Sequence, residues 1–355
     1  MKVTHILGID ISKDKFDVCL QPVGMEDTPG HHAAFDNTPA GFKKLRRWLA
    51  QQQAPYVHAC LEATSRYGDA LALFLHQQSH TVSIVNPRRI HHYAKSLLVR
   101  TQHDALDARI IARFCATQKT TAWQPTPPAL RQLQDLTRLR HFLVSQNQRL
   151  QNRAHTESPA LRRFLQRHLG QLEKSIAELE AQIAEHLQAH ASLAQQVALV
   201  DSIAGIGPVT AAAAVAELPP IERLEHAGQA VALAGLDPQK KDSGSSVRGV
   251  AHLSKMGSRP LRAALYMAAV SAQTHNPIVR ALAERLRAKG KTGKTVVCAA
   301  MRKLMRLIFG VLKTGKPFDP NYPAPARAVP CERARASGGD ELPSLQLASP
   351  PVATA

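Results

Sequence analysis

Short apolar runs alternate with amphipathic segments over the N-terminal third of the chain, and this alternation constrains the fold more than any other feature. Four runs have the length and composition of strands: residues 6–11, 16–20, 57–61 and 81–85. Four segments between or after them have helical spacing: residues 42–49, 67–77, 90–98 and 105–117. Strands that alternate with helices predict a mixed α/β sheet covered by helices on its faces.

The prolines at positions 125, 127 and 128 interrupt this pattern, so the first domain is predicted to span residues 1–124. Residues 125–200 are predicted to be helical. Apolar residues recur there at spacings of three and four: Leu172, Ile176, Leu179, Ile183 and Leu187. This spacing is typical of a coiled-coil seam, of one arm of a long helical hairpin, or of an ordinary amphipathic helix packed on its own domain.

A third domain is predicted at residues 201–318. It is mostly helical but is interrupted at residues 235–257 by a segment rich in Gly, Ser and Lys. Positive charge is concentrated here, because residues 240–316 contain 17 Lys and Arg but only two acids. Residues 319–355 are rich in Pro, Ala and Ser and lack periodicity, which predicts a disordered tail.

The whole chain of 355 residues has 45 Lys and Arg against 27 Asp and Glu, a formal net charge of +18. Such an excess favours nucleic acid as a partner; a basic charge that serves solubility alone is the alternative. The five cysteines lack metal-ligand spacing, and no apolar run is long enough to span a membrane. We therefore expect a cytoplasmic protein with reduced thiols and no membrane association.

Four acidic residues occur at the ends or starts of the predicted elements. Asp10 and Glu62 lie at the ends of two predicted strands, and Asp104 and Asp107 lie three apart at the start of a predicted helix, on one face. Two carboxylates about 4 Å apart repel by roughly 4 kcal/mol at an effective dielectric near 20. Magnesium, for which manganese can substitute, would relieve this repulsion and could activate a phosphodiester. Helix caps and surface charges are the alternative for each acid taken alone.

A second candidate site lies in the segment GLDPQKKDSGSSVRGVAHLSKMGSRPLR, residues 235–262. Ser243 is predicted to lie in a flexible turn surrounded by cations: Lys240, Lys241, Arg248, Lys255, Arg259 and Arg262. Cations beside a serine could steer a phosphate to its hydroxyl and neutralise charge in the transition state. A basic loop that only grips a nucleic-acid backbone is the alternative, and Ser245 and Ser246 are rival nucleophiles.

Three weaker features lie outside these two candidate sites. SIAGIGPVTA, residues 202–211, could hold a phosphate at a helix start or form a close helix-packing turn. GKTGKT, residues 290–295, lacks the early glycine of a P-loop and is predicted to be a basic turn between helices. The pairs His31-His32 and His91-His92 are interpreted as surface residues, with phosphate contact possible.

GIDIS, LEAT and DALDARIIA together resemble the RuvC-like (RNase H-like) domain of bacterial insertion-sequence transposases of the DEDD type, the bridge-RNA-guided recombinases. The succession Gly-Leu-x-Pro, Ser-Gly, Ser-Lys-x-Gly and Leu-Arg resembles their C-terminal domain. The resemblance extends to about residue 316. Gln102-His103 departs from it, since the family often has Lys-Thr before the first Asp of the pair.

This resemblance implies a function. Asp10, Glu62, Asp104 and Asp107 would bind the metal, and Ser243 would be the nucleophile that forms a phosphoserine link to DNA. Donor and target DNA would be recombined by a homo-oligomer, from dimer to tetramer, in the bacterial nucleoid. An element-encoded bridge RNA would select the target.

Two other functions remain open. The chain could be a RuvC-type Holliday junction endonuclease in which metal-activated water attacks and Ser243 only contacts a phosphate. It could also be a non-catalytic nucleic-acid-binding scaffold that retains its acids for structure.

Overall fold

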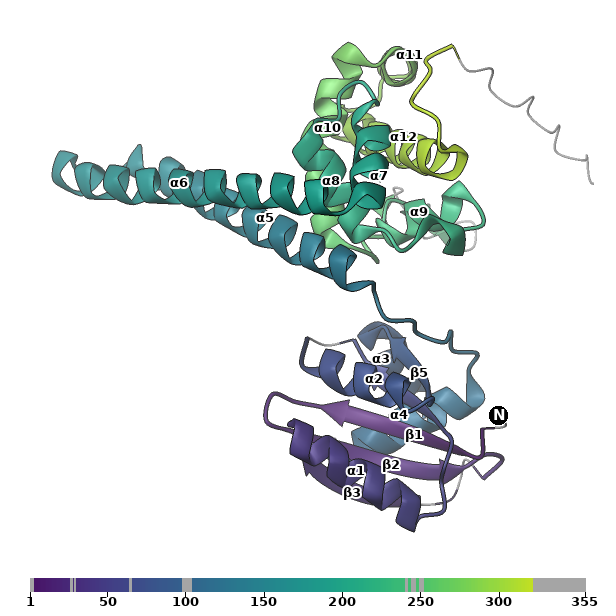
Figure 1. The fold of residues 1–355 in the computed structure, drawn as a ribbon. Coiled ribbons are helices and arrows are strands. Elements are labelled where there is room, and N and C mark those ends of the chain that lie inside the picture. The colour runs from purple at the N-terminus through teal and green to yellow at the C-terminus, as the bar shows by residue number, and fades with distance from the viewer. Residues whose placement is uncertain are drawn as a thin grey trace, which may run out of the picture. The chain divides into compact units, whose positions relative to one another are not determined.

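The computed structural model describes residues 3–25, 28, 30–63, 66–97, 104–239, 242–243, 247–248 and 252–321 (Figure 1). At residues 104–105, 242–243 and 247–248 the description is limited to the backbone. The chain divides into two compact units, Met1–Leu136 and Thr137–Ala355.

The first unit is built on a five-stranded sheet. Its strands, in spatial order, are β3 (His31–Asp36), β2 (Lys15–Pro22), β1 (His5–Ile11), β4 (Val57–Glu62) and β5 (Thr81–Val85). β1, β2 and β3 pair antiparallel, whereas β4 runs parallel to both β1 and β5. The predicted mixed α/β sheet is therefore confirmed. β3 was not predicted from the sequence, because HHAAFD is an edge strand with no buried residue and only one large apolar side chain, Phe35.

Helices cover both faces of this sheet. α1 (Pro39–Gln51) and α2 (Asp69–Gln77) pack through Phe42, Leu45 and Leu71 on one face. α3 (Pro87–Ser96) and α4 (Asp104–Thr117) contribute Ile90 and Ile111 to the core on the other. α1 and α3 each begin at a proline that follows a capping side chain. Thr38 accepts from the backbone N–H of Gly41 at 3.2 Å, and Asn86 accepts from that of Arg88 at 2.9 Å.

Two long helices follow, α5 (Pro128–Ala154) and α6 (Pro159–Ala189). Within the second unit they form a hairpin (Figure 1). Arg140 of α5 donates there to Glu180 of α6 at 2.7 Å. Leu179 and Ile183 of the apolar repeat are buried within the chain itself. Of the three interpretations of that repeat, the arm of a helical hairpin is the one observed at these positions.

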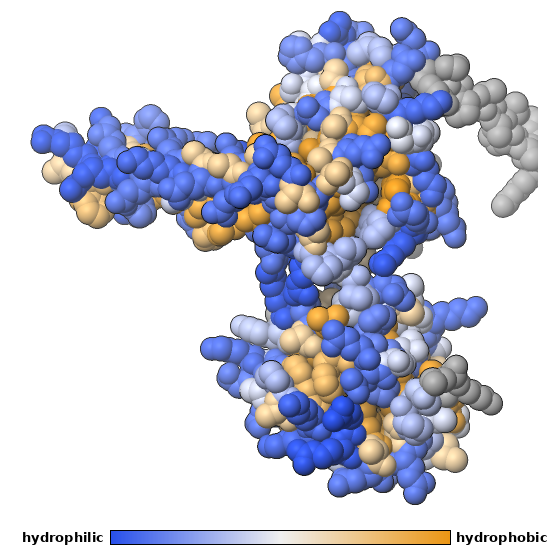
Figure 2. All heavy atoms as spheres, in the orientation of Figure 1, coloured by the Kyte–Doolittle hydropathy of each residue, from blue (hydrophilic) through white to orange (hydrophobic). Residues whose placement is uncertain are grey.

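The surface of this arm mixes hydrophilic and apolar side chains (Figure 2). Four large apolar side chains on α5 and α6 are about half exposed or more: Leu139, Phe142, Leu161 and Phe164.

The rest of the second unit is a cluster of helices. They are α7 (Ala191–Asp201), α8 (Pro208–Glu217), α9 (Ala227–Leu233), α10 (Arg259–His275), α11 (Pro277–Ala288) and α12 (Gly293–Thr314). Gly205, in the loop between α7 and α8, has φ +97°, and a Cβ there would lie 2.6 Å from the Cα of Ala272 in α10. Residues 202–211 therefore form a close helix-packing turn. The GKTGKT segment supplies the turn between α11 and α12 and the first turn of α12, close to the prediction.

The serine-containing segment differs from its prediction. It forms two short antiparallel strand pairs, β6 (Pro238–Gln239) with β9 (His252–Leu253) and β7 (Asp242–Ser243) with β8 (Val247–Arg248). Ser243 thus lies at the end of a strand, opposite Val247, and not in a flexible turn. Strand pairing, which local composition does not reveal, produces this hairpin. Ser245, Ser246, Lys240 and Lys241 lie outside the described residues, as does the tail from residue 322 onward.

Within the described part of the chain, no helix is long and apolar enough to cross a membrane.

Candidate active site

Asp10 and Glu62 end up as neighbours because β1 and β4 run in parallel. Their register pairs Ile9 with Leu61, so each acid is the next residue along its strand. Side chains alternate between the two faces of a sheet, so Asp10 shares a face with Ile6, and Glu62 shares a face with Cys60. Ile6 and Cys60 belong to the core beneath α4. Both half-buried carboxylates therefore lie on the face that α4 covers.

α4 approaches this face at Gly8, two residues before Asp10. A Cβ at Gly8 would lie 2.1 Å from the carbonyl oxygen of Ala108 and 2.3 Å from the backbone nitrogen of Ala112. Only glycine permits a helix backbone to lie so close to a strand. This contact brings the start of α4, and with it Asp107, to the edge of the sheet where β1 and β4 end.

The electrostatics of Glu62 agree with this arrangement. Burial raises the pKa of the Glu62 carboxyl, and the charges of Asp10 and Asp107 raise it further. Three of the four predicted acids, from β1, β4 and α4, therefore lie within electrostatic reach of one another. The fourth, Asp104, begins α4 one turn before Asp107, and its backbone alone is described.

Asp17 is a further acid at this position that sequence reasoning missed. It lies directly opposite Asp10 in the β1–β2 register, on the same face of the sheet. Its side chain is 17% exposed and forms an ion pair with Lys15 at 3.4 Å. The two strands predicted at residues 6–11 and 16–20 contained the necessary signal, because pairing them as a hairpin places residues 10 and 17 opposite each other.

The donor set has the chemistry of a divalent-metal site. Carboxylate oxygens are the hard ligands that Mg²⁺ and Mn²⁺ prefer, and a cation would reverse the repulsion that raises the pKa of Glu62. Within the described residues, however, no three metal-ligating side chains are close enough to hold an ion. The side chain of Asp104 is not part of that set.

The base of the serine hairpin in the second unit is fastened by Arg262. Its guanidinium donates to the carbonyl oxygens of Ala234 at 2.9 Å and Gly257 at 3.0 Å, on either side of the hairpin. Burial lowers the pKa of Arg262, and the neighbouring Arg259 lowers it further. Arg262 thus uses part of its donor set inside the protein, whereas Lys255 and Arg259 are exposed.

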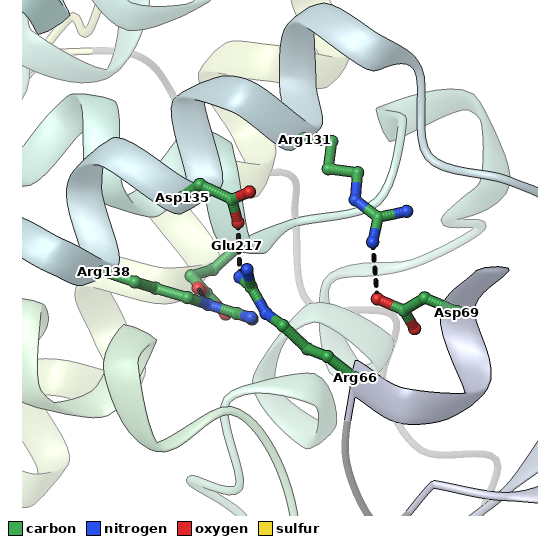
Figure 3. A network of polar contacts seen from close by, with 6 residues as sticks. All are labelled: Arg66, Asp69, Arg131, Asp135, Arg138 and Glu217. Atoms are coloured by element: carbon green, nitrogen blue, oxygen red, sulfur yellow. Dashed lines mark hydrogen bonds and ion pairs between the residues drawn. The ribbon is translucent and has the colours of Figure 1, made fainter. Parts of the chain in front are cut away.

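Glu217 holds the start of α10, the helix that follows this hairpin. Its side chain is 4% exposed and accepts from Arg138 of α5 at 2.6 Å (Figure 3). It also accepts from the Ser258 hydroxyl at 2.7 Å. Ser258 also caps α10, accepting from the N–H of Leu261 at 3.1 Å. Glu217 therefore couples the position of α5 to the start of α10.

Two further ion pairs in Figure 3 belong to the first unit. Arg131 contacts Asp69 at 2.6 Å, and Arg66 contacts Asp135. They attach the first turns of α5 to the segment that follows Glu62, and, being partly exposed, each contributes no more than about 1 kcal/mol.

Comparison with known proteins assigns the chain to a family. A transposase family model, of the DEDD type found in IS110, matches residues 7–164, and a second, of IS116/IS110/IS902 transposases, matches residues 197–284. The pilin gene-inverting protein of Moraxella bovis is 31% identical over 322 residues, covering 90% of this chain and 98% of the relative. The chain belongs to the IS110 family of transposases.

Other relatives agree with this family. The pilin gene-inverting protein of Moraxella lacunata is 31% identical with the same coverage. A probable family 20 transposase of Pseudomonas aeruginosa is 28% identical over 260 residues, covering 63% of this chain and 74% of the relative. As a member of this family of transposases, the protein acts on DNA and exchanges phosphodiester bonds, and transposases of the DEDD type typically use divalent metal ions.

Proposed function

We propose that this IS110-family transposase recombines DNA with two cooperating sites, an acidic metal centre in the first unit and a serine nucleophile in the second. The observation that carries the first half is the convergence of Asp10, Glu62 and Asp107, which raises the pKa of Glu62. We include Asp104 because it lies one helical turn from Asp107 at the start of α4.

The four acids Asp10, Glu62, Asp104 and Asp107 would hold Mg²⁺ or Mn²⁺. Such an ion supplies positive charge that polarises a phosphodiester and stabilises the oxygen that leaves it. The contribution of the chain is to hold these carboxylates in place. β1 and β4 fix Asp10 and Glu62, while the close contact at Gly8 fixes the helix that carries the other two.

The nucleophile we propose is Ser243, on the basis of the sequence resemblance. Its hydroxyl oxygen would bond to phosphorus as one P–O bond of the DNA backbone breaks, and the released sugar oxygen would take up a proton. The reverse step on a new strand would restore the phosphodiester without ATP. Lys255 and Arg259 are exposed and could contact the DNA backbone beside the hairpin, together with Lys240, Lys241, Arg248 and the remaining donors of Arg262.

A water nucleophile is the alternative with a specific observation in its favour. The acids that the structure gathers are those a RuvC-like nuclease uses, and activated water at that centre could cut DNA without any serine. In that case Ser243 would contact a phosphate only. A scaffold without catalysis is disfavoured, because grouped carboxylates that repel one another cost stability and serve no structural purpose there.

The biological reaction is also a proposal. Two relatives are named pilin gene-inverting proteins, so this chain could invert a DNA segment as well as move an insertion element. From the resemblance, we propose guidance by an element-encoded bridge RNA and assembly as a dimer or tetramer. We also retain residues 1–124, 125–200, 201–318 and 319–355 as its functional divisions.

The test mixes the protein with magnesium, element-junction DNA, target DNA and RNA transcribed from the element's end. DNA attached covalently to protein is then sought on a denaturing gel. We expect an adduct that Ser243→Ala abolishes and that Ser245→Ala and Ser246→Ala, as matched controls, retain. Asp10→Asn should abolish all cleavage.

The other outcomes decide between the alternatives. Cleavage without an adduct, unchanged by Ser243→Ala, would replace the serine with water. An adduct formed equally well without RNA would remove the guide. Full activity of Asp10→Asn would refute the metal centre.

A further inference from the structure

A cationic groove lies between α11 and α12, away from every residue assigned a role above. It has a volume of about 670 Å³. Four apolar or small residues line it: Ile278, Ala281, Leu282 and Ala299. Four cations line it as well: Arg285, Arg302, Lys303 and Arg306. Three of these cations come from α12, at spacings of one and three residues, and Arg285 faces them from α11.

These cations are crowded without compensation. Burial lowers the pKa of Lys303, and the charges of Arg306 and Arg285 lower it further. The buried Nε of Arg302 has no hydrogen-bond partner. Among the residues that the structure describes, no carboxylate forms an ion pair with any of the four cations.

A buried donor without a partner destabilises the fold, and like charges held close together add to that cost. A groove that holds four cations together and leaves one of their buried donors unsatisfied has the chemistry of a site for a polyanion. Phosphate oxygens would accept from the guanidinium groups and neutralise the crowded charge.

The lining also indicates which form of nucleic acid fits. Proteins that bind single strands stack the bases on aromatic side chains, and none of the eight lining residues is aromatic. A cationic rim over small and aliphatic side chains suits the sugar-phosphate backbone of a duplex, which is gripped without base contacts. DNA is the polyanion on which this family acts.

We propose that the α11–α12 groove binds the phosphate backbone of double-stranded DNA, with Arg302 and Lys303 as its central contacts. This inference requires only that the protein acts on DNA. It is independent of which group attacks the phosphodiester.

The test measures binding of a short fluorescein-labelled DNA duplex by anisotropy over a range of salt concentrations, without magnesium, so that no cleavage occurs. The variant Arg302→Gln/Lys303→Gln is compared with Lys289→Gln/Lys291→Gln. This control removes the same charge from exposed positions in the adjacent turn. We expect the groove variant to bind roughly tenfold to a hundredfold more weakly, and the slope of log K against log salt to shrink by about 1–2. The control should change far less.

Folding is controlled separately. If Arg302→Gln/Lys303→Gln melts at a lower temperature by circular dichroism, Arg285→Gln/Arg306→Gln replaces it, because both of these side chains are exposed and their loss should not affect folding. The proposal is overturned if groove and control variants lose affinity equally, or if the salt slope is unchanged. It is also overturned if only an RNA duplex of the same sequence binds more weakly. Because the assay detects no cleavage, none of these results bears on Ser243 or on the acids.

Discussion

Replacing Gly8 with alanine should damage both the stability of the first unit and its chemistry. The new Cβ would lie 2.1 Å from the carbonyl oxygen of Ala108 and 2.3 Å from the nitrogen of Ala112, both of which are backbone atoms of α4. Neither atom can rotate away as a side chain could. Ordinary contact would require α4 to move outward by about 1 Å or more.

The cost of that movement can be estimated. Inserting a methyl group into a packed interior typically costs about 1–3 kcal/mol of unfolding free energy. Asp107 precedes Ala108 and would move with the helix relative to Asp10 and Glu62. A displacement of about 1 Å at a catalytic group can lower the rate by roughly a hundredfold. We therefore expect magnesium-dependent DNA cleavage to fall much further than stability alone would explain.

Urea titration followed by tryptophan fluorescence measures the stability directly, since both tryptophans, Trp48 and Trp123, lie in the first unit. Gly68→Ala is the matched control. Gly68 has φ −79°, and its Cβ would meet nothing closer than 3.6 Å, so this variant should be neutral or slightly more stable. Equal stability and equal cleavage in Gly8→Ala and the wild type would refute the close packing of α4 on β1.

Three further predictions concern single side chains. Glu62→Gln should raise the unfolding free energy by no more than about 1 kcal/mol, because it removes a carboxylate opposed by burial and like charges that solvent partly screens, yet abolish cleavage; a destabilised variant would contradict this. Glu217→Gln should lower the melting temperature of the full chain, because about 1–3 kcal/mol of unfolding free energy is lost with the charge. The loss is smaller than for a fully buried ion pair, since Arg138 is 38% exposed. An unchanged melting temperature would show that the contacts of Glu217 with Arg138 and Ser258 contribute nothing to stability. Burial lowers the pKa of His80, so the unfolded chain binds its proton more readily, and stability present above about pH 6.5 should be lost as the pH falls. His80→Gln should flatten that decline in the urea midpoint, while the exposed control His91→Gln should leave it as in the wild type.

Local patterns predicted the first unit well where the elements are long and periodic. Short apolar runs located β1, β2, β4 and β5, and helical spacing located α1, α2, α3 and α4. These features depend on neighbours within a few residues, which a single sequence contains. β3 and the strands around Ser243 were not predicted, because short strands with little apolar content exist only through the pairing partner that supplies their hydrogen bonds.

The candidate sites also contain residues that local sequence could indicate and residues that only the fold brings together. The acids could be proposed from their positions at the ends of elements, and the family from the motifs around them. Asp17 and the groove between α11 and α12 could not, since each depends on residues brought together from separate elements.

The sequence by itself determined that this is a basic chain with acids at strand ends and a serine in a cationic segment, because composition and short-range spacing are properties of the chain alone. Tertiary structure alone decided that the apolar repeat of α6 is buried at Leu179 and Ile183 in a hairpin, and that Asp107 reaches Glu62. Both results depend on how closely elements distant in the sequence can pack. At Gly8 that closeness rests on the absence of a single carbon atom.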